Sequence, residues 1–221
     1  MAKEYRKNIR TRSATGWTRD TPLYEIFADG ILRWFGSGVT RVTTHADKGS
    51  GSAQFDTNAE LGYSASIGRN FPKVDAERIV IRFSIFMFTN AQANSEFEVI
   101  FQLGVNGIDF SYIPTLRFDF DAADNFDINI SEDWGDTYES LEDNLPYGGF
   151  DGFVPIELIV DLATKKYVSL KIGSKEFDIS EFNLNESSVT RTQPSCAYFC
   201  LTNTSAAAQQ TRLDNVVVEY L

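Results

Sequence analysis

Two pairs of carboxylates have a spacing that could serve acid–base chemistry: Glu96 and Glu98 in SEFEVIF, and Asp119 and Asp121 in RFDFDA. Residues two apart in a strand point to the same face, with their side chains about 6–7 Å apart. At that distance one carboxylate can raise the pKa of the other, which creates an acid beside a base. The same spacing is found on any solvated strand face, so both interpretations stay open.

The segment from Ser131 to Gly152, SEDWGDTYESLEDNLPYGGFDG, interleaves aromatic rings with carboxylates and an amide. Aromatic rings pack against the C–H faces of sugars, while amides and carboxylates form hydrogen bonds with sugar hydroxyls. We expect residues 131–153 to form a long loop. Its composition predicts a carbohydrate-binding site made by Trp134, Tyr138, Tyr147, Asp133, Asp136 and Asn144. The alternative is an ordinary loop whose aromatic rings pack onto the domain.

The chain lacks the residues that nucleophilic or zinc-dependent catalysis would need. The chain has one histidine, His45, in a polar stretch, and no Gly-x-Ser-x-Gly nucleophile turn. Cys196 and Cys200 have no cationic context that would lower a thiol pKa. In one strand they would lie about 13 Å apart on the same face, too far for a disulfide, so we expect two buried free thiols. So few His and Cys residues exclude a zinc site.

The net charge of −11 is unevenly distributed. Residues 1–19 hold six Lys or Arg and one acid, whereas thirteen Asp or Glu and no base lie between Arg117 and Lys165. So acidic a protein is not expected to bind nucleic acid. Because opposed charges steer association, we predict a homo-oligomer in which the basic N-terminal arm, residues 1–20, docks on another copy through Trp17. The alternative is an arm that folds back on its own subunit or is disordered.

The first residues, MAKEYRKNIRTRS, contain no apolar run, and no stretch of about 20 apolar residues occurs anywhere in the chain. The sequence as given therefore predicts no export signal and no membrane association. We expect a cytoplasmic or particle-associated protein.

The sequence predicts that the elements positioning these residues are strands. The stretch 78–89, RIVIRFSIFMFT, is nearly all apolar at its end, as in a central strand, and the dipeptide Asn106-Gly107 marks a hairpin. TLRFDFDA alternates strictly, with Arg117 and Asp119 on the face opposite the apolar residues. About a dozen short strands, with no helical period, predict an all-β fold: a two-sheet antiparallel sandwich over residues 21–221 as a single domain.

Three stretches resemble jelly-roll domains of the concanavalin A-like lectin/glucanase (LamG-like) superfamily. The opening, PLYEIFADGILRW followed by GSGVTRVTTHADKGSGSAQFDTN, is similar to their first strand, acidic turn, Trp and Gly-Ser strand. PIELIVDLATKKYVSLKIGSKEFDI is similar to their back-sheet hairpin, and RLDNVVVEY to their closing strand. The resemblance covers residues 22–221 and implies a jelly-roll β-sandwich. It identifies neither an individual family nor an activity.

The resemblance also implies a structural calcium ion where the first and last strands lie side by side. Asp214 occupies the position of the ligand from the last strand, with Glu25 or Asp29 opposite and backbone carbonyls near Lys48 completing the shell. Calcium prefers six to eight oxygen ligands, which two carboxylates, carbonyls and water would supply. The alternative is that Asp214-Asn215 only turns the chain into a strand.

Glycosidases of this fold carry a Glu-x-Asp-x-x-Glu motif for their two catalytic carboxylates, and this chain lacks it. The sequence therefore predicts a non-catalytic, lectin-like module that binds carbohydrate. A structural component of a viral or phage particle is the alternative. A glycoside hydrolase that uses one of the two carboxylate pairs is the less favoured third.

Overall fold

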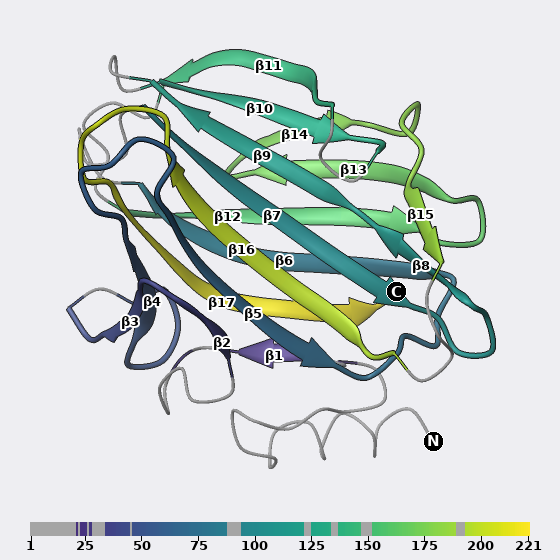
Figure 1. The fold of residues 1–221 in the computed structure, drawn as a ribbon. Helices are drawn as coiled ribbons and strands as arrows, with labels where there is room; N and C mark the ends of the chain where they lie inside the picture. The colour runs from purple at the N-terminus through teal and green to yellow at the C-terminus, as the bar shows by residue number, and fades with distance from the viewer. Residues whose placement is uncertain are drawn as a thin grey trace.

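The computed structural model describes residues 21, 23–25, 27, 34–44, 46–87, 94–121, 125–133, 137–146, 152–188 and 193–221. In these residues the chain forms seventeen strands and no helix. The strands lie in two layers that pack face to face as a sandwich (Figure 1), and all pairings between named strands are antiparallel. The predicted all-β sandwich is confirmed.

One layer is an eight-stranded sheet. Its order is β14 (Lys175–Asp178), β13 (Lys166–Ile172), β12 (Gly152–Asp161), β6 (Arg78–Met87), β17 (Gln210–Tyr220), β4 (Ser52–Asp56) and β3 (Val39–Val42). The first strand, β1 (Leu23–Glu25), pairs with the last, β17. As predicted, the apolar strand β6 is central, because β12 and β17 flank it.

The other layer is a nine-stranded sheet. Its order is β11 (Glu139–Pro146), β10 (Asn125–Ser131), β9 (Thr115–Phe120), β7 (Ser95–Gly104), β16 (Ser195–Asn203), β5 (Ser64–Phe71) and β2 (Phe35–Ser37). Two short strands complete it, since β8 (Phe110–Ile113) pairs with β7 and with β15 (Asn185–Ser188).

Alternation along each strand explains how the core is filled. In β9, Leu116, Phe118 and Phe120 are buried, while Arg117 and Asp119 are only half-buried on the opposite side. β7 and β16 follow the same period, so rings such as Phe97 and Phe199 meet between the layers. Such a core of apolar side chains contributes most of the stability.

Two polar contacts cross the core and tie the layers together. The Tyr167 hydroxyl, on β13, accepts a hydrogen bond from the Thr115 N–H at 2.9 Å and donates one to the Ser131 carbonyl at 2.9 Å. Glu25 on β1 forms a buried ion pair with Arg69 on β5. Buried polar groups are tolerated when they are paired in this way.

The structure corrects the expectation of a long loop over residues 131–153. Residue 131 ends β10, the edge strand β11 occupies Glu139–Pro146, and β12 begins at Gly152. The alternative reading of Asp214-Asn215 as a turn into a strand is also wrong. Both residues lie inside β17, where the pairing register shifts and Asn215 has a φ of 52°, so they form a β-bulge.

The N-terminal arm, residues 1–20, lies outside the described residues, so its role in a homo-oligomer stays a prediction. Within the described part of the chain, no helix has the length and hydropathy needed to cross a membrane.

Candidate functional site

The outer face of the nine-stranded sheet carries a continuous polar surface. Strands β7, β9, β10 and β16 point every second residue into the core, so the residues between them point away from it. Cross-strand register brings these outward residues into rows. The row that crosses Cys200 contains Glu98, Arg117 and Asn129, and the next row contains Thr202, Glu96, Asp119 and Asp127.

Tyr138, just before edge strand β11, lies over this surface. Its ring covers the Arg117 guanidinium, with the guanidinium carbon 4.0 Å from the ring centroid. Its hydroxyl donates a hydrogen bond to Glu98 Oε1 at 2.7 Å. Burial, and then the hydrogen bond to the Glu98 carboxylate, raise the pKa of Tyr138 well above its usual value. The phenol therefore stays protonated at neutral pH.

Beneath Tyr138, Arg117 and Asp119 form an ion pair within β9. The Arg117 Nη2 donates to Asp119 Oδ2 at 2.9 Å, and Arg117 Nε lies 2.8 Å from Oδ1. Asn129, on the neighbouring strand β10, donates its amide to Asp119 Oδ2 at 2.9 Å. Burial raises the pKa of Asp119, Arg117 opposes that rise, and the carboxylates of Glu96 and Asp127 add to it. The Asp119 carboxylate is thus held by side chains from two strands, β9 and β10.

A second aromatic cluster lies on the same face, on the far side of β7. Tyr198 of β16 pairs across the sheet with Gly68 of β5, which in turn pairs with Phe35 of β2. A side chain at Gly68 would collide with the Phe35 ring, because an added Cβ would lie 2.5 Å from it. Phe35 is 51% exposed, unusual for so large an apolar residue. Rows of aromatic rings on a polar surface are typical of ligand contacts.

The two cysteines are free and lie in the same strand, β16, as expected, but only Cys200 is buried, whereas Cys196 is half-buried. Burial raises the pKa of both the Cys196 and the Cys200 thiols. Protonated thiols at neutral pH are poor nucleophiles, so neither residue is placed for covalent chemistry.

The predicted ligand residues are brought together only in part. Tyr138 lies over the sheet, whereas the Asp133 carboxylate accepts hydrogen bonds from Ser131 and Thr137, which lower its pKa. The Asn144 N–H donates to Asp127 Oδ1 at 2.7 Å, which fixes β11 to β10. Trp134, Asp136 and Tyr147 lie outside the described residues, so their part in a site stays a prediction.

Within each of the two carboxylate pairs noted in the sequence, the two members have different contacts. Glu98 holds Tyr138, but Glu96 has no hydrogen bond or ion pair within the described part of the chain. Asp119 belongs to the Arg117 pair, whereas Asp121 lies beyond the end of β9 and accepts the Asn125 N–H at 3.0 Å in the connection to β10.

The residues proposed for calcium do not fit an ion shared by Glu25 and Asp214. Glu25 accepts hydrogen bonds from the Phe27 N–H at 2.7 Å and the Trp34 indole at 3.4 Å, besides its ion pair inside the sandwich. Asp214 Oδ2 accepts hydrogen bonds from the N–H groups of Asp47 and Lys48, each at 2.8 Å, so this oxygen is already engaged by that segment. The described residues contain no cluster of three or more metal-binding side chains. Asp29 lies outside them.

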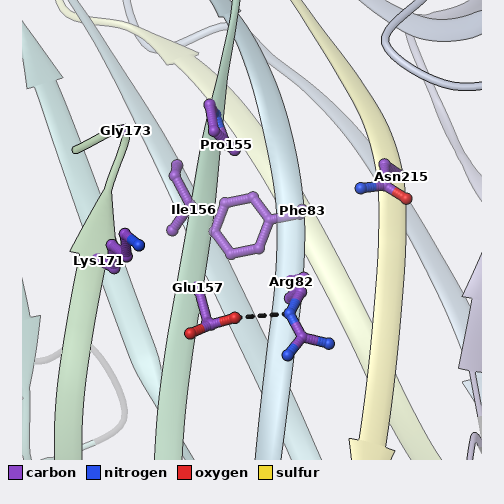
Figure 2. A pocket seen from close by; sticks show the side chains of 8 residues that line it. All are labelled: Arg82, Phe83, Pro155, Ile156, Glu157, Lys171, Gly173 and Asn215. Atoms are coloured by element: carbon purple, nitrogen blue, oxygen red, sulfur yellow. Dashed lines mark hydrogen bonds and ion pairs between the residues drawn. The ribbon is translucent and has the colours of Figure 1, made fainter.

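The opposite surface, on the eight-stranded sheet, has a shallow pocket of about 180 Å³ (Figure 2). Arg82 lies at its edge and donates from Nε to Glu157 Oε2 at 2.6 Å, while Asn215 approaches from the bulge in β17. Pockets for small molecules usually measure about 300–1,000 Å³. This pocket is smaller, and two of its charged residues, Arg82 and Glu157, are already paired with each other, which makes it the weaker candidate.

Comparison with known proteins gives fold neighbours and nothing closer. No family model matches the chain, and no curated protein matches it in sequence. Among solved structures, Cellulose induced protein, Cip1, is similar with a TM-score of 0.57 and 14% identity, covering 90% of this chain and 97% of that one. The likeness is one of fold.

Two further solved structures have the same fold. An endo-β-1,4-glucuronan lyase from Trichoderma reesei matches with a TM-score of 0.55 and 12% identity, over 91% of this chain and 96% of that one. A legume lectin-like domain from Entamoeba histolytica matches with a TM-score of 0.54 and 10% identity, over 86% and 90%. The chain therefore shares its jelly-roll sandwich fold with these proteins, and a shared fold does not identify an activity.

Sequence reasoning did not single out Arg117, Asn129 or Tyr198 as site residues. The alternation of TLRFDFDA already placed Arg117 beside Asp119 on an outward face. What the sequence could not supply is the cross-strand register, which sets Asn129 beside Arg117 and Tyr198 beside Gly68. Only that register turns separate strand faces into one surface.

Proposed function

We propose that the chain is a non-catalytic carbohydrate-binding module, and that its site is the outer face of the nine-stranded sheet, centred on Tyr138. One observation carries the proposal. A half-buried tyrosine ring lies on Arg117, with its hydroxyl fixed on Glu98, above a surface of carboxylates and an amide.

Each part of this surface suits a sugar. The ring face of Tyr138 that Arg117 does not cover can pack on sugar C–H groups, because that contact needs a flat apolar surface held in place. The carboxylates offer planar hydrogen-bonding groups for hydroxyls, and the buried Asn129 amide holds Asp119 in place. Strands β9 and β16 lie about 10 Å apart across β7, so Tyr138 and Tyr198 are spaced for an oligosaccharide rather than for one sugar ring.

Most groups that acid–base or covalent chemistry would need are engaged or protonated. Glu96 is not engaged within the described residues, but the carboxylates beside it are. Glu98 binds the Tyr138 hydroxyl and Asp119 binds Arg117. Tyr138 and Cys200 have raised pKa values, so neither supplies a base or nucleophile at neutral pH. The lectin-like neighbour supports binding, while the lyase neighbour makes a direct test for catalysis necessary.

The test is a glycan array followed by titration of the bound glycans. We expect Tyr138→Ala to weaken binding at least about tenfold, equal to about 1.4 kcal/mol. Tyr138→Phe, which keeps the ring and removes the hydrogen bond to Glu98, should weaken it less. Arg82→Met, on the opposite surface, serves as the matched control and should bind as the unmodified protein does.

Three results would count against the proposal. Failure to bind any glycan, or unchanged binding by Tyr138→Ala, would contradict the site. Cleavage products from a bound glycan, seen by mass spectrometry and lost in Glu98→Gln, would contradict the non-catalytic assignment.

A further inference from the structure

Three carboxylates lie side by side on the proposed binding face. Glu96 of β7 is directly opposite Asp119 of β9, and Asp119 is directly opposite Asp127 of β10. The negative charges of Glu96 and Asp127 act on Asp119. Burial raises the pKa of Asp119 most, and these two carboxylates raise it further. A negative group placed over this row would meet repulsion from three strands at once.

The cation nearest to this row is already engaged. Arg117 Nη2 donates a hydrogen bond to Asp119 Oδ2 at 2.9 Å, and its Nε lies 2.8 Å from Oδ1 in the same ion pair. The flat face of the same guanidinium lies under the Tyr138 ring, 4.0 Å from its centroid. A ligand carboxylate is usually recognised by a free, bidentate guanidinium. To bind one here, Arg117 would first have to leave Asp119.

No other cation on the sheet can replace it. The nine strands of this sheet contain no Lys and only two Arg, Arg69 and Arg117, and Arg69 is turned into the core against Glu25. The same strands contain eight acids: Glu96, Glu98, Asp119, Asp127, Glu139, Glu142, Asp143 and Glu186. Two of these acids pair with lysines from outside the sheet, Glu142 with Lys175 and Glu186 with Lys165. The unbalanced negative charge therefore lies on the outer face around Glu96, and no free cation accompanies it on these strands.

We propose that the face selects glycans without negative charge, namely neutral and amino sugars, and excludes uronic-acid polymers. This inference rests on the proposed carbohydrate-binding function and adds the class of ligand to it. A neutral sugar keeps the Arg117–Asp119 pair intact and donates its hydroxyls to the carboxylates. An amino sugar also gains attraction to Glu96, which has no hydrogen bond or ion pair among the described residues. A uronate meets repulsion without a free cation to balance it.

The experiment is an array of immobilised oligosaccharides in matched triplets, each with a neutral, an amino and a uronate member of the same linkage. One triplet comprises cello-oligosaccharides, β-1,4-glucosamine oligomers and β-1,4-glucurono-oligomers. At low salt we expect neutral and amino members to bind at least about tenfold more tightly than the uronate. The gap should shrink in 1 M salt, where charges are screened beyond about 3 Å.

The outcomes separate the two proposals. Uronates that bind as tightly as their neutral partners, with loss in Tyr138→Ala, would overturn the inference and leave the binding function standing. An array without any bound glycan would overturn both.

A charge-reversal variant supplies a gain of binding, which misfolding does not produce. Glu96→Lys places a free cation on the face, and we expect uronate binding at low salt to rise at least about tenfold. Glu176→Lys changes the net charge equally on β14 of the other sheet and should leave uronate binding unchanged. Equal behaviour of the two variants would show that net charge, instead of this face, sets the selectivity, and would overturn the inference.

Discussion

The two sheets of the sandwich differ in their balance of acidic and basic residues. The strands of the eight-stranded sheet contain eight acids and seven bases, whereas those of the nine-stranded sheet contain eight acids and two bases. On the first sheet the outward charges pair along the strands: Arg78 with Asp161, and Arg82 with both Glu157 and Glu219. On the second, Asp119, Glu142 and Glu186 form ion pairs, two of them with lysines from outside the sheet, whereas the Glu96 side chain has no such partner within the described residues.

Several charged residues of the eight-stranded sheet are bound to one another, whereas part of the charge on the nine-stranded sheet is available for a ligand. Pairs such as Arg82–Glu157 satisfy one another, and exposed pairs of this kind contribute about 0–1 kcal/mol each. An excess of like charge has no structural benefit, because neighbouring acids repel each other. The nine-stranded sheet combines that excess with Tyr138, Tyr198 and Phe35, which points to a surface shaped by binding.

The largest expected effect concerns Arg69, one of the two bases in the nine-stranded sheet, which faces the core. Arg69→Met leaves the Glu25 carboxylate buried without its cation, and we expect a loss of about 3–5 kcal/mol in the free energy of unfolding. The double variant Glu25→Gln/Arg69→Met should recover part of it. Chemical denaturation measures both. A loss below about 1 kcal/mol in the single variant would show that Arg69 is not a core residue.

A second prediction concerns Asp214, an outward acid of the eight-stranded sheet that is fully buried under the segment containing Asp47 and Lys48. Burial raises its pKa to about 6, opposed by the N–H groups of Lys48, Asn215 and Asp47, and helped by the Asp47 carboxylate. The folded state therefore binds this proton more tightly than the unfolded state. Stability present below about pH 4 is lost as the pH rises to about 6.

The measurement is the unfolding free energy of the protein and of Asp214→Asn at several pH values. Relative to the variant, the unmodified protein should lose at most about 3 kcal/mol between pH 4 and pH 6.5. Asp161, whose pKa is lowered by the Thr164 N–H and by Arg78, should behave in the opposite direction, with stability lost as the pH falls. A difference that does not change with pH would refute the assignment for Asp214.

A smaller effect is expected at Tyr167, which connects the eight-stranded sheet to the floor of the proposed site. Tyr167→Phe leaves the Thr115 N–H and the Ser131 carbonyl without their partner, at a cost of about 1–3 kcal/mol. Tyr63→Phe is the control, since the Tyr63 hydroxyl makes no hydrogen bond within the described residues. Equal melting temperatures for the two variants would contradict a structural role for this bridge.

The smallest effect is expected on the paired surface. Arg82→Met removes a half-exposed partner of Glu157 and Glu219, so we expect a loss of about 1 kcal/mol in stability and no change in glycan binding. A loss of binding in this variant would indicate that the glycan binds at the pocket on the eight-stranded sheet and would contradict the proposed difference between the two sheets.

The sequence predicted the architecture well, because alternation is a local signal. The period in β9, the central position of β6 and the hairpin at Asn106-Gly107 could all be read along the chain. The strand β11 was missed, since Glu139–Pro146 is an edge strand with little buried surface and hence a weak pattern.

The candidate site was predicted less well, because it depends on contacts across strands. Tyr138 was chosen for its composition alone. Its partners Arg117 and Glu98 are 21 and 40 residues away in sequence, and no local pattern indicates that pairing. The position of Glu25 was unpredictable for a related reason: it points into the core, where it pairs with Arg69, a contact between sheets that no strand pattern shows. A calcium ion held by Asp214 and Asp29 stays a prediction.

The most direct test of the central claim is a crystal structure with a neutral oligosaccharide chosen from the array. We expect electron density for sugar rings on the outer face of the nine-stranded sheet, with one ring packed on Tyr138 and hydroxyls within hydrogen-bonding distance of Glu96 or Asp119. Density in the Arg82–Asn215 pocket of the opposite sheet, with the Tyr138 face empty, would contradict it.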